Sequence, residues 1–230
     1  KNKSLNILSS RLFKSLDDIF KTINPDWVLI QGDTTTTTIS ALAAYYRGIK
    51  IAHIEAGLRT DDLQNPFPEE GNRQIISRIA DINFAPTKSS VFNLLKEGIK
   101  KNKILLTGNT IVDSINYIKK LKLTPTNIQH INYLFLNDFN FDPSMKFIYV
   151  TFHRRENHGE NLHLFINLIK KIVNNYPHLN IVIPVHLNPK VKKALLRNLS
   201  KIKTIFLLPS LSYINSLFLI SKCEFIITDS

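Results

Sequence analysis

The sequence has 230 residues, 43% of them hydrophobic, which is enough chain to bury the core of one large domain or two small ones. No apolar run approaches the roughly 20 residues that span a bilayer, and the first residues lack the apolar stretch of a signal peptide, so a cytoplasmic protein without a membrane partner is expected. The formal charge is +12, but the lysines are scattered, which favours solvated helix ends over a nucleic-acid surface and is compatible with an anionic substrate.

Short apolar runs alternate with amphipathic segments of helix length, a pattern typical of the strands and crossover helices of a parallel α/β sheet. In the first half of the chain we predict strands at residues 27–31, 50–54, 82–85 and 104–107. Helices are predicted at residues 5–21, 35–47, 69–79, 89–97 and 111–120. These elements form a predicted N-terminal Rossmann-like domain, residues 1–120.

The same alternation follows a predicted domain junction at residues 121–145. The junction is placed there because the segment contains Pro and Asn and has mixed polarity without a clean period. Beyond it we predict strands at residues 146–151, 180–185, 204–207 and 225–228, and helices at residues 162–174, 189–199 and 213–221. Residues 146–230 are therefore predicted to form a second Rossmann-like domain.

The motif QGDTTTT follows the first predicted strand and opens a helix. Gly32 permits a tight turn there, and a helix N-terminus offers N–H groups that can hold an anion. The alternative is that Asp33 or Thr34 only caps the helix.

Two further motifs carry carboxylates. HIEAGLRT places Glu55 beside small residues at the end of the second strand, and PFPEEGNR contributes Glu69, Glu70 and Arg73. An alternative role for either of the adjacent glutamates is to stabilise the positive end of the following helix. Because ligands of open parallel sheets bind at the carboxyl ends of the strands, we expect Asp33, Glu55 and Glu69 to face one site. Converging carboxylates can supply both a proton donor and a proton acceptor.

The second half carries histidines at strand ends. In YVTFHRREN, His153 is followed by two arginines, which predicts a phosphate or acid–base site, the alternative being a structural histidine. His186 in IPVHLNP either lines the same site or caps a helix. No His or Cys pair has the spacing of a zinc site, and neither GxGxxG nor a P-loop occurs. We therefore predict no metal and no dinucleotide cofactor.

From about Trp27 to Ser230 the chain resembles the non-hydrolysing UDP-N-acetylglucosamine 2-epimerases, in the segments QGDTTTT, HIEAGLRT, PFPEEGNR, TGNTIVDS, TFHRREN, PVHLNP and TDS. The resemblance implies a glycosyltransferase B fold with the active site between two Rossmann-like domains. It also implies reversible C2 epimerisation of UDP-N-acetylglucosamine to UDP-N-acetylmannosamine through elimination and re-addition of UDP, without a cofactor, in a homodimer.

The resemblance further implies roles for seven residues. The catalytic residues are expected to be Asp33, Glu55, Glu69 and His153. The substrate-binding residues are expected to be Arg154, His186 and Ser230. Ser230 matches a phosphate contact, whereas Arg154 and His186 match positions that help to bind a second UDP-N-acetylglucosamine as activator in bacterial members.

Several alternatives stay open. The family's first strand and the turn beyond Ser230 are lacking, so the chain is expected to be incomplete at both ends, and this fragment alone can be inactive. A hydrolysing epimerase, which releases free N-acetylmannosamine, shares the fold, but HIEAGLRT and GDTTTT favour the non-hydrolysing branch. A non-catalytic remnant that at most binds nucleotide sugar is the rival from another class, and the retained carboxylates argue against it.

Overall fold

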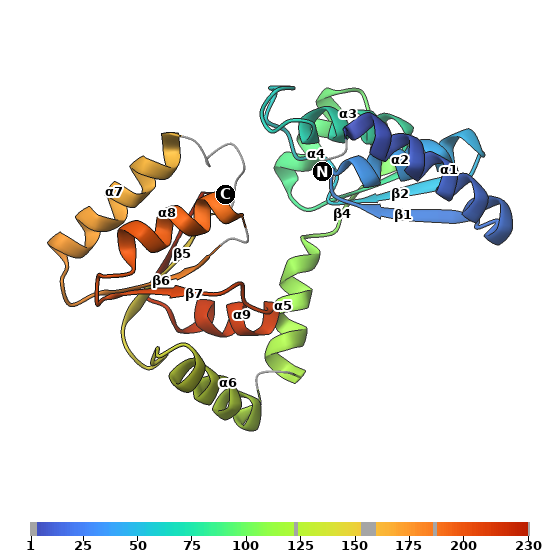
Figure 1. Ribbon diagram of the computed structural model, residues 1–230. Helices are drawn as coiled ribbons and strands as arrows, with labels where there is room; N and C mark the ends of the chain where they lie inside the picture. The colour runs from blue at the N-terminus through green and yellow to red at the C-terminus, as the bar shows by residue number, and fades with distance from the viewer. Residues whose placement is uncertain (1–3, 122–123, 153–159, 186–187, 230) are drawn as a thin grey trace. The chain divides into compact units, whose positions relative to one another are not determined.

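The computed structural model describes residues 4–121, 124–152, 160–185 and 188–229. The chain divides into two compact units, Lys1–Asp113 and Ser114–Ser230, and each contains a four-stranded parallel sheet (Figure 1). The dividing point lies within helix α5 (Thr110–Leu121). In the described parts of the chain, no helix combines the length and hydropathy needed to cross a membrane.

The sheet of the first unit has the order β1-β2-β3-β4, with every neighbouring pair parallel. Its strands are β1 (Trp27–Gln31), β2 (Lys50–Ile54), β3 (Ile82–Ala85) and β4 (Ile104–Leu106). The accompanying helices are α1 (Leu5–Ile23), α2 (Thr35–Tyr46), α3 (Glu69–Ile79), α4 (Lys88–Lys96) and a short 3-10 turn, η1 (Lys101–Lys103). Each strand and helix predicted in this half is present, with boundaries that differ by at most a few residues.

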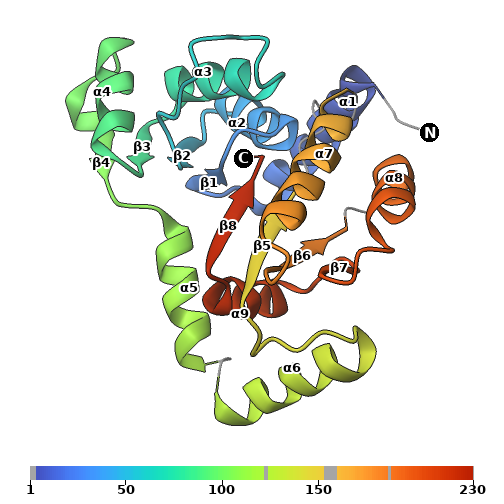
Figure 2. The same cartoon turned by 90° about the vertical axis from the view of Figure 1, so that its left-hand side faces the viewer.

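Helices α1, α2 and α3 lie side by side over the sheet of the first unit (Figures 1 and 2). Ala41 and Ala44 of α2 are fully buried, and their small side chains let the helix approach its neighbours closely. The core beneath these helices also contains Phe20, Ile30, Ile51 and Ile76. This packing fixes the positions of α2 and α3 relative to the strand ends that carry the candidate site.

The sheet of the second unit has the order β7-β6-β5-β8 and is also parallel. Its strands are β5 (Phe147–Thr151), β6 (Asn180–Pro184), β7 (Ile205–Leu208) and β8 (Phe225–Thr228). Its helices are α6 (Pro125–Asp138), α7 (Glu160–Asn175), α8 (Pro189–Leu199) and α9 (Tyr213–Lys222).

Helices cover both faces of this second sheet. Ile148 and Val150 of β5 belong to a core cluster with α7 and α8, whereas Phe147 and Tyr149 belong to a cluster with α6 and α9. Successive residues of a strand point to opposite faces, so burial on both faces requires the near-continuous apolar run FIYV. The alternation of strands and helices therefore confirms the predicted α/β class with parallel sheets.

Helix α6 occupies much of residues 121–145, a segment in which a domain junction and no helix had been predicted. Thr124 caps the helix, with its side chain accepting a hydrogen bond from the Asn127 amide, and a proline follows in the first turn. Ile131 and Phe135 are buried, but Tyr133 is 65% exposed. Large side chains on the outer face obscured the helical period in the sequence.

Candidate active site

The turn after β1 presents Asp33 beyond the carboxyl end of the strand. Gly32 has φ +76°, a left-handed conformation that favours glycine, and its amide donates to the Ile54 carbonyl at 3.1 Å. Thr34 is the N-cap of α2, because its side chain accepts a hydrogen bond from the Thr37 amide at 3.3 Å. Helix capping therefore falls to Thr34, and the Asp33 carboxylate is available for another task.

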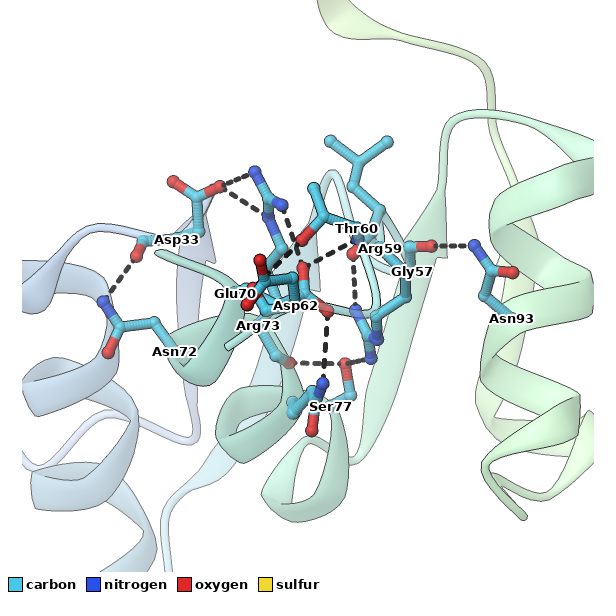
Figure 3. Close-up of polar contacts among 12 residues, drawn as sticks. Asp33, Gly57, Arg59, Thr60, Asp62, Glu70, Asn72, Arg73, Ser77 and Asn93 are labelled. Carbon is cyan, nitrogen blue, oxygen red and sulfur yellow. Dashed lines mark hydrogen bonds and ion pairs between the residues drawn. The ribbon is translucent and has the colours of Figure 1, made fainter. Parts of the chain in front are cut away.

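Helix α3 holds Asp33 from two sides (Figure 3). The Arg73 guanidinium donates from Nε at 2.8 Å and lies with Nη2 2.7 Å from the same atom, Asp33 Oδ2. The Asn72 side chain donates to the Asp33 backbone carbonyl at 2.7 Å. Both the backbone and the carboxylate of this residue are thus fixed in orientation.

Glu70 contacts Arg73 from the interior of the unit and is 0% exposed. Its Oε2 accepts hydrogen bonds from Arg73 Nη1 and from the Thr60 amide, each at 3.1 Å, and its Oε1 accepts from Gln74 at 3.1 Å. Burial alone would raise the pKa of Glu70, but the bonds from Gln74, Thr60 and Arg73 together lower it below its ordinary value. Glu70 is therefore held as a buried anion.

The loop after β2 carries Glu55 in a left-handed conformation, φ +68°. Two residues later, Gly57 has φ +87°, and a Cβ there would lie 2.4 Å from the Ser90 carbonyl oxygen, so only glycine fits. Asn93 of α4 donates to the Gly57 carbonyl at 3.0 Å. Glu55 Oε2 lies 3.9 Å from the position that a Cβ on Gly32 would take, which brings this carboxylate next to the turn that presents Asp33.

Arg59 pins the same loop to α3 and α4, and only 3% of its side chain is exposed. Its Nη2 donates to Glu97 at 2.8 Å. The same nitrogen donates to the Ser77 hydroxyl at 3.0 Å (Figure 3). Because the ion pair is largely buried, it constrains the end of the HIEAGLRT segment more strongly than a surface pair would.

Glu69 is the first residue of α3 and is half-buried. Within the described residues, its side chain makes no hydrogen bond or ion pair, in contrast to its neighbour Glu70. The structure therefore brings Asp33 and Glu55 to adjacent turns. Of the two adjacent glutamates, Glu70 is the one held by hydrogen bonds to its neighbours.

His53 was present in the motif but had no predicted role. It is 0% exposed, and its Nε2 lies 2.8 Å from the Gly32 carbonyl oxygen, which can only accept, so Nε2 carries the proton. Burial lowers the pKa of His53, against the opposing effect of the bond to Gly32. In the sequence, the signal for His53 is a polar residue within an apolar strand. In the structure, His53 pairs in register with Asn83, which is also buried.

The second unit has a topological switch point between β5 and β8. After β5 the chain adds β6 and β7 on one side of that strand, and it then crosses to the other side to form β8. Ligands of open α/β sheets bind in the crevice at such a point. Thr151 Oγ1 donates to Thr228 Oγ1 at 3.0 Å, which marks the carboxyl ends of the two strands. A hollow of about 380 Å³ opens there, lined partly by Phe152, Leu164 and Asp229.

Four of the predicted site residues lie outside the described residues: His153, Arg154, His186 and Ser230. In the chain, His153 follows the residue after β5, and Ser230 is two residues beyond β8. Across the described residues, no group of three or more His, Cys, Asp or Glu side chains is arranged to hold a metal ion.

Known sequences resemble the whole chain. The family described as UDP-N-acetylglucosamine 2-epimerase matches residues 1–230. A UDP-N-acetylglucosamine 2-epimerase of Campylobacter jejuni is 44% identical over 230 residues, which are 100% of this chain and 60% of that protein. One of Escherichia coli K12 is 36% identical over 231 residues, covering 99% of this chain and 60% of its own length. The chain thus spans about 60% of the length of these curated relatives.

Solved structures agree. The UDP-GlcNAc 2-epimerase of Neisseria meningitidis, bound to UDP-GlcNAc, has a TM-score of 0.91 at 40% identity, covering 100% of this chain and 61% of that one. The Methanocaldococcus jannaschii enzyme in complex with UDP-GlcNAc and UDP has a TM-score of 0.82 at 31% identity, covering 100% of this chain and 62% of that one. They confirm the predicted glycosyltransferase B type of fold. The chain belongs to the UDP-N-acetylglucosamine 2-epimerase family.

Proposed function

We propose that the protein converts UDP-N-acetylglucosamine reversibly to UDP-N-acetylmannosamine by inversion at C2, without net hydrolysis. The observation that carries this proposal is the pair of carboxylates, Asp33 and Glu55, at adjacent turns beyond the parallel strands β1 and β2. Family membership and the nucleotide-sugar ligands of the relatives support the same substrate class.

The proposed reaction requires two proton carriers. As the C2–H bond breaks, a carboxylate takes the proton, the C–H electron pair forms a C1=C2 double bond, and the C1–O electron pair leaves with UDP. The 2-acetamidoglucal intermediate then receives UDP again at C1 and a proton at the opposite face of C2. Two or more carboxylates facing one site can supply both the base and the acid. We assign these tasks to Asp33, Glu55 and Glu69.

The environment of Asp33 suits one of these roles. Arg73 binds a single oxygen of the carboxylate, and Oδ1 has no partner among the described residues. A carboxylate that is fixed through one oxygen and open at the other is held ready to accept a proton, because little reorientation is required on binding. The loop that carries Glu55 is likewise pinned by Asn93 and Arg59.

The diphosphate is assigned to the second unit. We propose His153 and Ser230 as its contacts, because they follow β5 and β8, the two strands that flank the switch point. A histidine next to an arginine can neutralise the charge that develops on a departing diphosphate. Arg154 and His186 are proposed to bind a second UDP-N-acetylglucosamine as activator, and the active protein is proposed to be a homodimer.

Product analysis tests this function against hydrolysis. The full-length gene product is incubated separately with UDP-N-acetylglucosamine and with UDP-N-acetylmannosamine, and UDP-sugars, free UDP and free sugars are separated by chromatography. The proposal predicts that both reactions converge on one mixture of the two UDP-sugars, with their total conserved. Free N-acetylmannosamine and UDP in equal amounts would instead establish a hydrolysing enzyme, and unchanged substrates would favour a non-catalytic protein.

A further inference from the structure

Glu70 contacts two separate segments of the candidate site through one oxygen atom. Its Oε2 accepts from Arg73 Nη1 and from the Thr60 amide, each at 3.1 Å (Figure 3). Arg73 in turn holds Asp33, and Thr60 is the last residue of the HIEAGLRT segment that carries Glu55. A single buried carboxylate thus links both catalytic candidates.

The link to Asp33 is a rigid one. Only 14% of the Arg73 side chain is exposed, and its planar guanidinium uses Nη1 for Glu70 while Nε and Nη2 face Asp33 Oδ2. Because these nitrogen atoms lie in one plane, fixing the Glu70 side of the plane also fixes the direction from which Asp33 is held. Without Glu70, the guanidinium would be held through Asp33 alone, and its plane would be less firmly fixed.

We infer that Glu70 is a positioning residue for the epimerisation, which orients the Asp33 carboxylate through Arg73 and fastens the Glu55 segment through the Thr60 amide. The inference rests on the proposed function. Glu70 has no access to a substrate because it is fully buried, so it acts only through these neighbours. Within the described residues, its neighbour Glu69 makes none of these contacts.

A double-mutant cycle on the full-length protein tests this role. Glu70→Gln is nearly isosteric but replaces one acceptor oxygen with a donor, and Arg73→Gln removes the guanidinium. We expect each single variant to lower kcat by about tenfold to a hundredfold, the range for small displacements of a reacting group, with KM changed less than about threefold. Asp17→Asn is the matched control, because its ion pair with Arg47 lies in the same unit and contacts no site residue.

The double variant decides between positioning and independent roles. If Glu70 acts partly through Arg73, the loss of kcat in the double variant is smaller than the product of the two single losses, because the contact between the two side chains is already absent in Arg73→Gln. A loss beyond that of Arg73→Gln then measures the contribution of the Thr60 contact. Multiplicative losses would overturn the inference, as would a kcat of Glu70→Gln equal to that of Asp17→Asn. If Glu70→Gln does not fold, Glu70→Asp retains the charge with a shorter reach, and an unchanged kcat in that variant would overturn the inference equally. Inactive wild-type protein would overturn the proposed function, and the inference with it.

Discussion

The Arg73 guanidinium contacts only one oxygen of the Asp33 carboxylate, with Nε at 2.8 Å and Nη2 at 2.7 Å from Oδ2. This asymmetry orients the carboxylate, and Oδ1 makes no hydrogen bond or ion pair with the described residues. The same residue does not cap α2, because Thr34 does so. Asp33 therefore takes no part in capping α2, which fits the catalytic role proposed for it.

Asp33→Asn is expected to lower kcat by at least about a hundredfold, the lower range for a lost acid–base group. The amide keeps an oxygen for Arg73, and Thr34 still caps the helix, so the midpoint of thermal unfolding should change little. Steady-state kinetics and circular dichroism on the same preparation check both expectations. Full activity in the folded variant would remove Asp33 from the catalytic group.

Gly57→Ala is expected to destabilise the protein by about 2 kcal/mol or more, since an alanine there adds a close contact with the Ser90 carbonyl to the cost of a left-handed backbone. Gly48→Ala is the matched control. Gly48 also has positive φ, +70°, but its Cβ would meet no atom within 4 Å, so it should cost only about 1 kcal/mol. Urea unfolding of both variants measures the difference, and equal losses would contradict a close approach at Gly57.

His53 predicts a pH dependence of stability. Its pKa is lowered in the folded protein from an ordinary value of 6.5, so the unfolded chain binds a proton at higher pH than the folded one. The free energy of unfolding is therefore not reduced by His53 above pH 6.5. It decreases as the pH falls from that value toward the pKa of His53 in the folded protein. Unfolding of wild type and His53→Gln from pH 7.5 downward should show the loss in wild type only. Parallel curves would contradict a buried neutral histidine.

Phe135→Ala tests the packing of α6. Phe135 is fully buried between Phe139, Phe141 and Phe218, so the substitution should cost about 3–5 kcal/mol. Tyr133→Ala, on the exposed face of the same helix, should change the free energy of unfolding by no more than about 0.5 kcal/mol. Similar losses for both variants would show that α6 packs through another face.

The strands and most helices were predictable because short apolar runs alternate with amphipathic segments of helix length, and several helices begin at a capping residue, as α2 does at Thr34 and α4 at Thr87. Helix α6 was not, since Tyr133 and Leu136 place apolar surface on its exposed side. Asp33 and Glu55 could be placed at one sheet edge from the strand-end rule alone. The contacts of Glu70 and His53 could not be predicted from the sequence. They depend on how α3 and the turn at Gly32 pack together, which no local pattern encodes.

Epimerisation at C2 is tested most directly by proton NMR of UDP-N-acetylglucosamine in deuterated water with the full-length protein and its Asp33→Asn variant. Wild type is expected to introduce deuterium at C2 while an anomeric signal of UDP-N-acetylmannosamine appears, and the variant is expected to slow both by at least about a hundredfold. Conversion with the C2 proton retained, or exchange at the wild-type rate in the variant, would contradict proton transfer at this site.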